Sequence, residues 1–259
     1  MPTVEVNGAR LWYDEAGSGP VVLLLHGGLG DSGLWEPVVP FLADRFRVIR
    51  TDLRFFGRSA GPAAPWSWVD DIVGVLDELD VERAALVGLS LGGKLALDVA
   101  VAHPERLWAL VHVAGGVGGH ASAPYTEEQE ARYEAAEAEA DLDAMMDVDF
   151  EVWAPLGADE TMARLWHATP DATGLPPGIG PLPAPVAARE KLAELDVPTL
   201  VITVSRDPAG QREAGLLLAR EAANARHIEL DSDHYVTLRE PELLARELTG
   251  FLATAAPKD

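Results

Sequence analysis

Short apolar runs alternate with amphipathic stretches along most of this chain, and this alternation limits its fold more than any other feature. Val21–Leu25 is a continuous apolar run, which is typical of a strand buried on both faces of a sheet. Strands are expected at 21–25, 46–51, 84–89, 107–113, 199–204 and 227–230, and helices at 32–42, 66–79, 91–103, 209–222 and 242–253. This order predicts an α/β fold with a doubly wound, mostly parallel sheet and right-handed crossovers.

The chain opens with a second kind of pattern. Residues 4–6 and 9–13 alternate between apolar and polar side chains, and they flank the dipeptide Asn7-Gly8. Asn-Gly readily supplies the positive φ angles of a two-residue hairpin turn. We therefore expect a β-hairpin ahead of the parallel strands.

The rhythm of strands and helices stops after Gly119. Residues 121–195 hold no expected strand, but helical patterns occur at 126–140, 142–153 and 159–168, followed by a Pro/Gly-rich link at 170–185. An insertion that leaves a parallel sheet at its strand ends covers the edge where open α/β sheets bind ligands. We expect a core of residues 1–119 and 196–259 and a helical cap (lid) of residues 120–195 inserted after the sixth strand, with a packing appendage as the alternative.

Composition limits the classes of partner and the kinds of catalytic chemistry that are expected for this chain. The 259 residues include 20 basic and 42 acidic side chains, and a net charge of −22 disfavours nucleic acid and membrane surfaces as partners. The absence of cysteine excludes disulfides, a thiol nucleophile and a thiolate zinc site. Because the N-terminus shows no signal peptide and no apolar stretch is long enough to span a bilayer, we expect a cytoplasmic protein that acts on a small molecule. The oligomeric state is left open.

The motif with the clearest chemistry is Gly88-Leu89-Ser90-Leu91-Gly92, which matches G-x-S-x-G. It lies where an expected strand gives way to an expected helix. A serine on such a sharp turn exposes its hydroxyl, and the flanking glycines remove side chains that would collide there. Ser90 is therefore the candidate nucleophile.

A second glycine-rich segment, His26-Gly27-Gly28-Leu29-Gly30, follows the first buried strand at the same edge of the expected sheet. An oxyanion hole needs two backbone N–H donors, and the residue after the nucleophile commonly supplies one of them. We expect Gly28 and Leu91 to be the pair, with Leu29 as an alternative to Gly28. His26 is expected to brace the loop by hydrogen bonding.

A nucleophilic serine needs a base and an acid that orients the base. His234 lies on a loop just past the last expected strand, whereas the other six histidines fall at positions typical of structural residues. Asp207 also follows a strand end and precedes His234, which gives the order Ser, Asp, His. Asp231 and Asp233 are too near His234 in sequence to face its ring, and Asp52 is interpreted as an ion-pair partner of a nearby arginine.

At these residues the chain resembles the α/β-hydrolase family, in its capped branch of esterases, lactonases, cofactor-free haloperoxidases and C–C bond hydrolases. The resemblance also rests on His26-Gly27-Gly28, on Asp52 through Gly57-Arg58-Ser59, on Val197-Pro198-Thr199 and on Asp233-His234 with Glu240-Pro241-Glu242. It covers nearly all of the chain outside the expected cap. It implies that Ser90 is the nucleophile, His234 the base and Asp207 the acid, with Gly28 and Leu91 as the oxyanion donors.

Two positions depart from the family pattern. Val204 stands three residues before Asp207, where the family commonly carries a glycine, so the loop is expected to depart from the usual path. Phe55 stands where glycine usually follows the arginine, and it is expected either to narrow the site or to fill the core. The serine at position 90 argues against haloalkane dehalogenase or epoxide hydrolase chemistry, because those relatives carry an aspartate there.

These observations predict a serine hydrolase that cleaves an ester or lactone of a small, largely apolar substrate through an acyl-enzyme, with no metal or organic cofactor. Trp153 and Trp166 in the cap, and Tyr235 or Val236 beside the base, are the candidate substrate contacts, with packing in the core of the cap as the alternative for each. A C–C bond hydrolase, a haloperoxidase or perhydrolase, or a lyase would use the same triad. A ligand receptor without catalytic activity is the alternative from another functional class.

Overall fold

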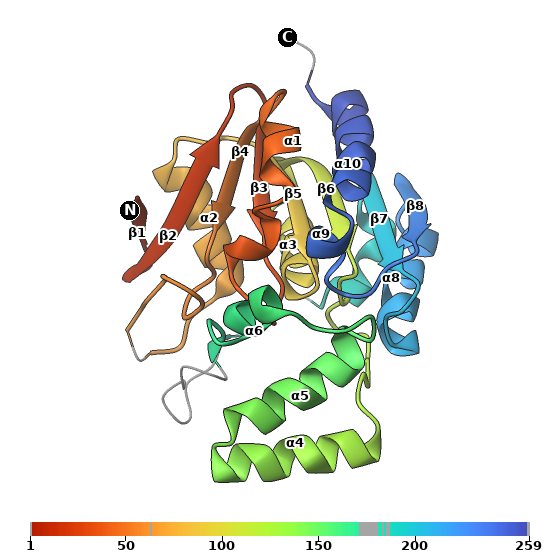
Figure 1. The fold of residues 1–259 in the computed structure, drawn as a ribbon. Coiled ribbons are helices and arrows are strands. Elements are labelled where there is room, and N and C mark those ends of the chain that lie inside the picture. Colours follow the sequence, from red (N-terminus) through yellow and green to blue (C-terminus); the bar gives the residue numbers. More distant parts are fainter. Residues whose placement is uncertain (1, 63, 171–180, 183, 185–186, 258–259) are drawn as a thin grey trace.

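The computed structural model describes residues 2–62, 64–170, 181–182, 184 and 187–257, and at its centre lies an eight-stranded sheet (Figure 1). The strands follow the spatial order β1-β2-β4-β3-β5-β6-β7-β8. Their bounds are β1 Thr3–Val6, β2 Ala9–Ala16, β3 Val21–Leu25, β4 Arg47–Thr51, β5 Ala84–Leu89, β6 Leu107–Val113, β7 Thr199–Val204 and β8 Ala225–Leu230. The predicted mostly parallel, doubly wound sheet is confirmed.

Strand pairing shows where the parallel part begins. From β4 to β8 every neighbouring pair runs parallel, whereas β1 pairs with β2 and β2 with β4 in antiparallel fashion. The expected hairpin is present, because Val6 pairs with Ala9 around Asn7 and Gly8, whose φ angles are 49° and 76°. Parallel strands put all their carboxyl ends at one edge, so residues that follow them gather there.

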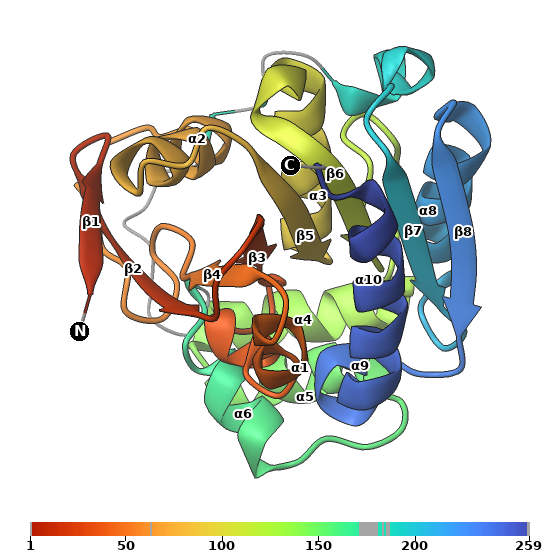
Figure 2. The same ribbon diagram turned by 90° about the horizontal axis from the view of Figure 1, so that it is seen from above.

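Helices cover both faces of the sheet (Figure 2). On one face pack α2 Trp68–Glu78, α3 Leu91–Ala102 and α8 Ala209–Glu221, and on the other α1 Val39–Ala43 and α10 Pro241–Ala255. Shorter turns are η1 Ser32–Trp35, η2 Pro104–Arg106, η3 Ala188–Glu190, η4 Leu192–Glu194 and α9 Val236–Arg239. No helix in these ranges has the length and apolarity to cross a membrane. The strands between the layers are almost fully buried, which explains why their sequences are mostly apolar.

The prediction of a single helix over residues 32–42 is wrong. The chain forms the 3-10 helix η1, then a turn at residues 36–38, and then the five-residue helix α1. Pro37 lies between the two, and a proline has no N–H for the i to i−4 ladder and clashes with the preceding turn. One buried cluster nevertheless contains Leu34, Trp35 and Leu42. The apolar spacing therefore predicted correctly which side chains are buried, but it predicted a continuous helix that is not formed.

In its described residues, the inserted segment (residues 120–195) between β6 and β7 contains the α-helices α4 Glu127–Glu139, α5 Leu142–Trp153 and α6 Glu160–Trp166, as well as η3 and η4. The side chains of Thr126, Asp141 and Asp159 accept hydrogen bonds at their three N-termini, as good N-cap residues do. Figure 1 shows these helices beside one edge of the sheet. Most of the predicted link at 170–185 falls outside the described residues.

Candidate active site

Ser90 lies on a sharp turn between β5 and α3. Its φ of 55° is rare for a residue with a side chain, and its N–H donates to Val113 O at 2.9 Å. A Cβ at Gly88 would lie 2.1 Å from Gly92 O, and a Cβ at Gly92 would lie 2.2 Å from Leu25 O. Both glycines are therefore required by backbone contacts, and the strained serine between them remains half-exposed.

The loop after β3 passes directly beside this turn. A Cβ at Gly27 would lie 3.2 Å from Ser90 Cβ, and one at Gly28 would lie 3.9 Å from Leu91 Cβ. No hydrogen bond among the described residues uses the N–H of Gly28, Leu29 or Leu91. Two unused amides beside a serine are what an oxyanion hole requires, and the choice between Gly28 and Leu29 stays a prediction.

Asp207 and His234 come from neighbouring strands and meet in a buried contact. Asp207 follows β7 and His234 follows β8, and His234 Nδ1 lies 3.0 Å from both carboxylate oxygens of Asp207. The His234 side chain is 5% exposed and the Asp207 side chain is 1% exposed. Asp207 N–H donates to Val204 O at 3.4 Å, so the valine in place of the usual glycine still permits the turn that presents the acid.

The serine and the histidine are not hydrogen-bonded to each other in this conformation. No hydrogen bond of the described residues joins Ser90 Oγ to His234, although both residues follow carboxyl ends of parallel strands. Catalytic hydrogen bonds are often long in proteins without substrate and tighten only in the complex. Among the described residues no cluster of three or more His, Asp or Glu is placed to hold a metal ion.

The other two acids near His234 are engaged elsewhere. Asp233 is fully buried and accepts from Arg239 Nη2 at 2.9 Å, from Leu156 N at 3.3 Å and from Tyr235 N at 3.2 Å. Asp231 is exposed and bonds to Ser205 and Arg206. The expectation that neither faces the imidazole is confirmed by these contacts.

Asp52 and His26 take part in the hydrogen bonds that hold the glycine-rich loop after β3. Asp52 accepts from Arg58 Nε at 2.7 Å and from Ser32 N at 3.0 Å, so the expected ion pair is present with Arg58. Burial alone would raise the pKa of the Asp52 carboxyl, but the hydrogen bonds that it accepts from Arg58 and Ser32 outweigh burial and lower that pKa. His26 Nε2 accepts from Leu53 N at 2.9 Å, and burial lowers the pKa of His26, which keeps this brace neutral.

Phe55 occupies an unusual backbone position. Its φ is 70°, in the left-handed region that glycine favours, which explains why relatives commonly carry glycine there. Its ring is half-buried and packs edge-on against Trp66, with 4.7 Å between ring centroids. These contacts favour the interpretation of Phe55 as packing.

The three expected substrate contacts differ in their surroundings. The Trp153 ring lies against the His234 imidazole, with centroids 4.3 Å apart, and Trp153 O accepts from His234 N at 3.2 Å. Tyr235 is buried against Phe150, with 6.0 Å between ring centroids, and its hydroxyl has no hydrogen-bond partner among the residues that the structure describes. Trp166 is fully buried among the helices of the inserted segment. Their contact with substrate remains a prediction, and Trp153 is the one whose ring contacts the candidate base, at an interplanar angle of 45°.

Sequence reasoning missed a buried polar group behind Trp153. Asp149 on α5 is 2% exposed and accepts from Tyr125 Oη and from Trp166 Nε1, each at 2.6 Å. The spacing Met145, Asp149, Trp153 places this acid on the buried stripe of α5. The signal available in the sequence was that Asp149 lies four residues after the apolar Met145 and four residues before the apolar Trp153.

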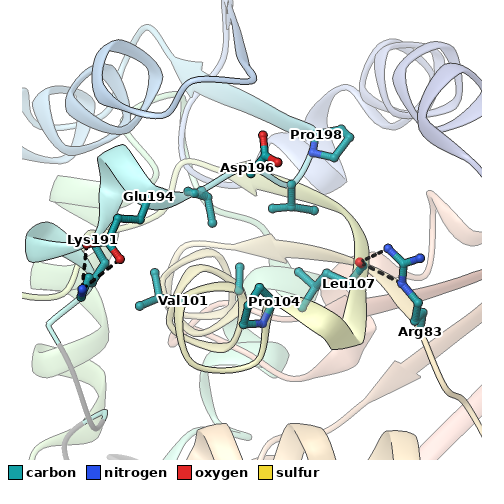
Figure 3. A pocket seen from close by; sticks show the side chains of 11 residues that line it. Arg83, Val101, Pro104, Leu107, Lys191, Glu194, Asp196 and Pro198 are labelled. Carbon is teal, nitrogen blue, oxygen red and sulfur yellow. Dashed lines mark hydrogen bonds and ion pairs between the residues drawn. The ribbon is translucent and has the colours of Figure 1, made fainter.

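A pocket of about 680 Å³ lies away from these residues (Figure 3). It is formed where β6 and β7 begin, by Arg83, Leu107, Pro198 and a Lys191–Glu194 ion pair, together with the end of α3. Open α/β sheets bind ligands at the carboxyl ends of their strands. Because this pocket lies at the opposite ends, the candidate active site remains the edge that carries Ser90, Asp207 and His234.

Comparison with known proteins identifies the family. The family model described as alpha/beta hydrolase fold matches residues 20–177, more than half of the chain. The chain is 32% identical over 265 residues to the 2-hydroxymuconate semialdehyde hydrolase of Pseudomonas sp. strain CF600, covering 96% of this chain and 92% of that protein. It is 26% identical to the 3-oxoadipate enol-lactonase 1 of Acinetobacter baylyi, with 96% and 92% covered.

A solved structure gives the same result at the level of the fold. The enol-lactonase from Burkholderia xenovorans LB400 superposes with a TM-score of 0.76 at 24% identity, covering 97% of this chain and all of that one. A likeness at this identity speaks for the fold alone. With the family match and the full-length relatives, it shows that the chain belongs to the α/β-hydrolase family.

Proposed function

We propose that this protein is a serine hydrolase that cleaves a carboxylic ester or lactone of a small, largely apolar substrate. The observation that carries the proposal is the buried Asp207–His234 contact at 3.0 Å at the strand edge that also presents Ser90 on its strained turn. A base that is held by a carboxylate and lies at the same strand edge as a half-exposed serine is the arrangement expected for acyl transfer through that serine.

The proposed reaction uses only groups of this chain and water. Ser90 Oγ attacks the carbonyl carbon while His234 Nε2 takes the hydroxyl proton, and the oxyanion is held by the N–H groups of Leu91 and Gly28 or Leu29. Collapse expels the alcohol, which receives the proton from His234. Water then attacks the acyl-enzyme with His234 as base and releases the acid. Asp207 orients the imidazole through Nδ1 and stabilises its charged form.

The inserted segment (residues 120–195) is proposed to act as a lid over this edge. Its support is the contact between Trp153, the last residue of α5, and His234. The segment after α5 is also tied to the base loop, because Asp233 accepts from Leu156 N and Arg239 donates to Gly157 O. A lid in this position would exclude water and supply apolar substrate contacts.

The test is covalent labelling of the serine. Intact mass would be measured after treatment with a fluorophosphonate for the wild type, Ser90→Ala and Ser205→Ala, while hydrolysis of short p-nitrophenyl esters and small lactones is followed. We expect one adduct in the wild type and in the Ser205→Ala control and none in Ser90→Ala, with turnover of Ser90→Ala lower by several orders of magnitude. A folded wild-type protein that takes no label would refute the proposal and favour a ligand receptor.

A second candidate is cleavage of a carbon–carbon bond by the same triad. The full-length likeness to a protein named 2-hydroxymuconate semialdehyde hydrolase is the observation that favours it. Supplying that semialdehyde in parallel with the esters and lactones separates the two reactions. Turnover of the semialdehyde with no turnover of esters or lactones would replace the first candidate by the second.

A further inference from the structure

A buried carboxylate, Asp149, is connected to the candidate base His234 through Tyr125 and Trp153. Asp149 is 2% exposed and accepts hydrogen bonds from Tyr125 Oη and from Trp166 Nε1, each at 2.6 Å. Removing a carboxylate from water is costly unless its hydrogen bonds compensate.

Hydrogen bonds connect this carboxylate to the ring that covers the base. Tyr125 Oη donates to Asp149 and accepts from Trp153 Nε1 at 3.1 Å, and the Trp153 ring lies 4.3 Å from the His234 imidazole at an interplanar angle of 45°. Burial and the Asp149 charge raise the pKa of Tyr125, so its hydroxyl remains a donor. A continuous chain of contacts therefore runs from Asp149 to His234.

We propose, building on the proposed serine hydrolase function, that Asp149 is a positioning residue that acts through Tyr125 and Trp153 to stabilise the His234 imidazolium formed during acyl transfer. Aromatic faces attract cations, most strongly those of tryptophan. Successive hydrogen bonds polarise one another, so an indole N–H that points toward a carboxylate through a hydroxyl leaves the ring richer in electrons. The same chain fixes the ring against His234.

The other charged and titratable groups around His234 are known from the structure. Asp207 bonds to its Nδ1, and Asp233, the preceding residue, is paired with Arg239 of α9. Tyr235 follows His234 in the sequence, and Ser90 follows β5 at the same carboxyl-terminal edge of the parallel strands. None of these groups changes in the variants below, so a change in the titration of His234 reports on the chain from Asp149.

The experiment measures the rate of fluorophosphonate adduct formation and kcat/KM for p-nitrophenyl esters as functions of pH. The variants are Asp149→Asn, which removes the charge, and Tyr125→Phe, which breaks the chain but keeps the charge. Glu151→Gln is the matched control, because Glu151 lies on the same helix and pairs with Arg132 on the surface. It removes one negative charge two residues from Asp149 without touching the chain.

Loss of imidazolium stabilisation lets His234 release its proton at lower pH. We expect the acid limb of both profiles to move down by about half to one pH unit in Asp149→Asn and Tyr125→Phe, with the plateau rate about tenfold lower and KM changed less than kcat. Glu151→Gln should follow the wild type in both respects. A merely structural defect would lower the plateau and leave the limb in place.

An unmoved limb in a labelled Tyr125→Phe protein would overturn the proposal, and so would a shift in Asp149→Asn that Tyr125→Phe lacks. If Asp149→Asn does not fold, Tyr125→Phe decides, because Tyr125 is half-exposed and loses only its hydroxyl. A wild type without label would instead refute the serine hydrolase function. The two failures are therefore distinguishable.

Discussion

Replacing Arg239 by alanine should destabilise the protein, because it leaves a carboxylate uncompensated in the interior. Asp233 is fully buried, and the guanidinium contacts both its oxygens, with Nη2 at 2.9 Å and Nε at 3.1 and 3.2 Å. Breaking a buried ion pair from one side costs about 3–5 kcal/mol. Here the Arg239 side chain is 21% exposed and Asp233 keeps two backbone donors, so we expect about 2–3 kcal/mol.

Urea unfolding, followed by circular dichroism and tryptophan fluorescence, would measure this loss. At about 2–4 °C per kcal/mol for a chain of this size, the midpoint of thermal unfolding should fall by about 4–12 °C. The same substitution in an Asp233→Asn background should cost at least about 1 kcal/mol less, since no charge is then left unpaired. An Arg239→Ala protein as stable as the wild type, or equal costs in both backgrounds, would refute this reasoning.

Two further predictions concern the turn and the response to acid. Gly92→Ala would place a Cβ 2.2 Å from Leu25 O, so we expect a loss of about 3 kcal/mol or more in urea unfolding and loss of Ser90 labelling; near-wild-type values for both would contradict the steric argument. Burial lowers the pKa of His26 and of His112, so the unfolded chain takes up protons first and stability falls as the pH drops below about 6.5, by up to about 2.7 kcal/mol per pH unit for the two groups. His112→Asn should reduce that slope by about half, and an unchanged slope would show that His112 does not contribute.

Local patterns were sufficient for most of the fold. The runs at β3, β5, β6 and β7 are mostly apolar because these strands are buried on both faces, and the Asn7-Gly8 turn is fixed by its own backbone preferences. The two-part shape of 32–43 was not found from spacing, although Pro37 was visible. Periodicity reports which side chains are buried, whereas the helix ends where a backbone donor is missing.

For the site, the sequence by itself determined the residue types and their strand-end positions, which led to Ser90, Asp207 and His234. Only the tertiary structure decided that Asp207 contacts Nδ1 while Asp233 binds Arg239, because these pairings join residues that different strand ends and helices bring together. The Asp149–Tyr125–Trp153 chain is likewise set by how α5 packs on the base loop. Hydrogen bonds between distant segments depend on distances of a few tenths of an ångström, and local sequence patterns carry no such information.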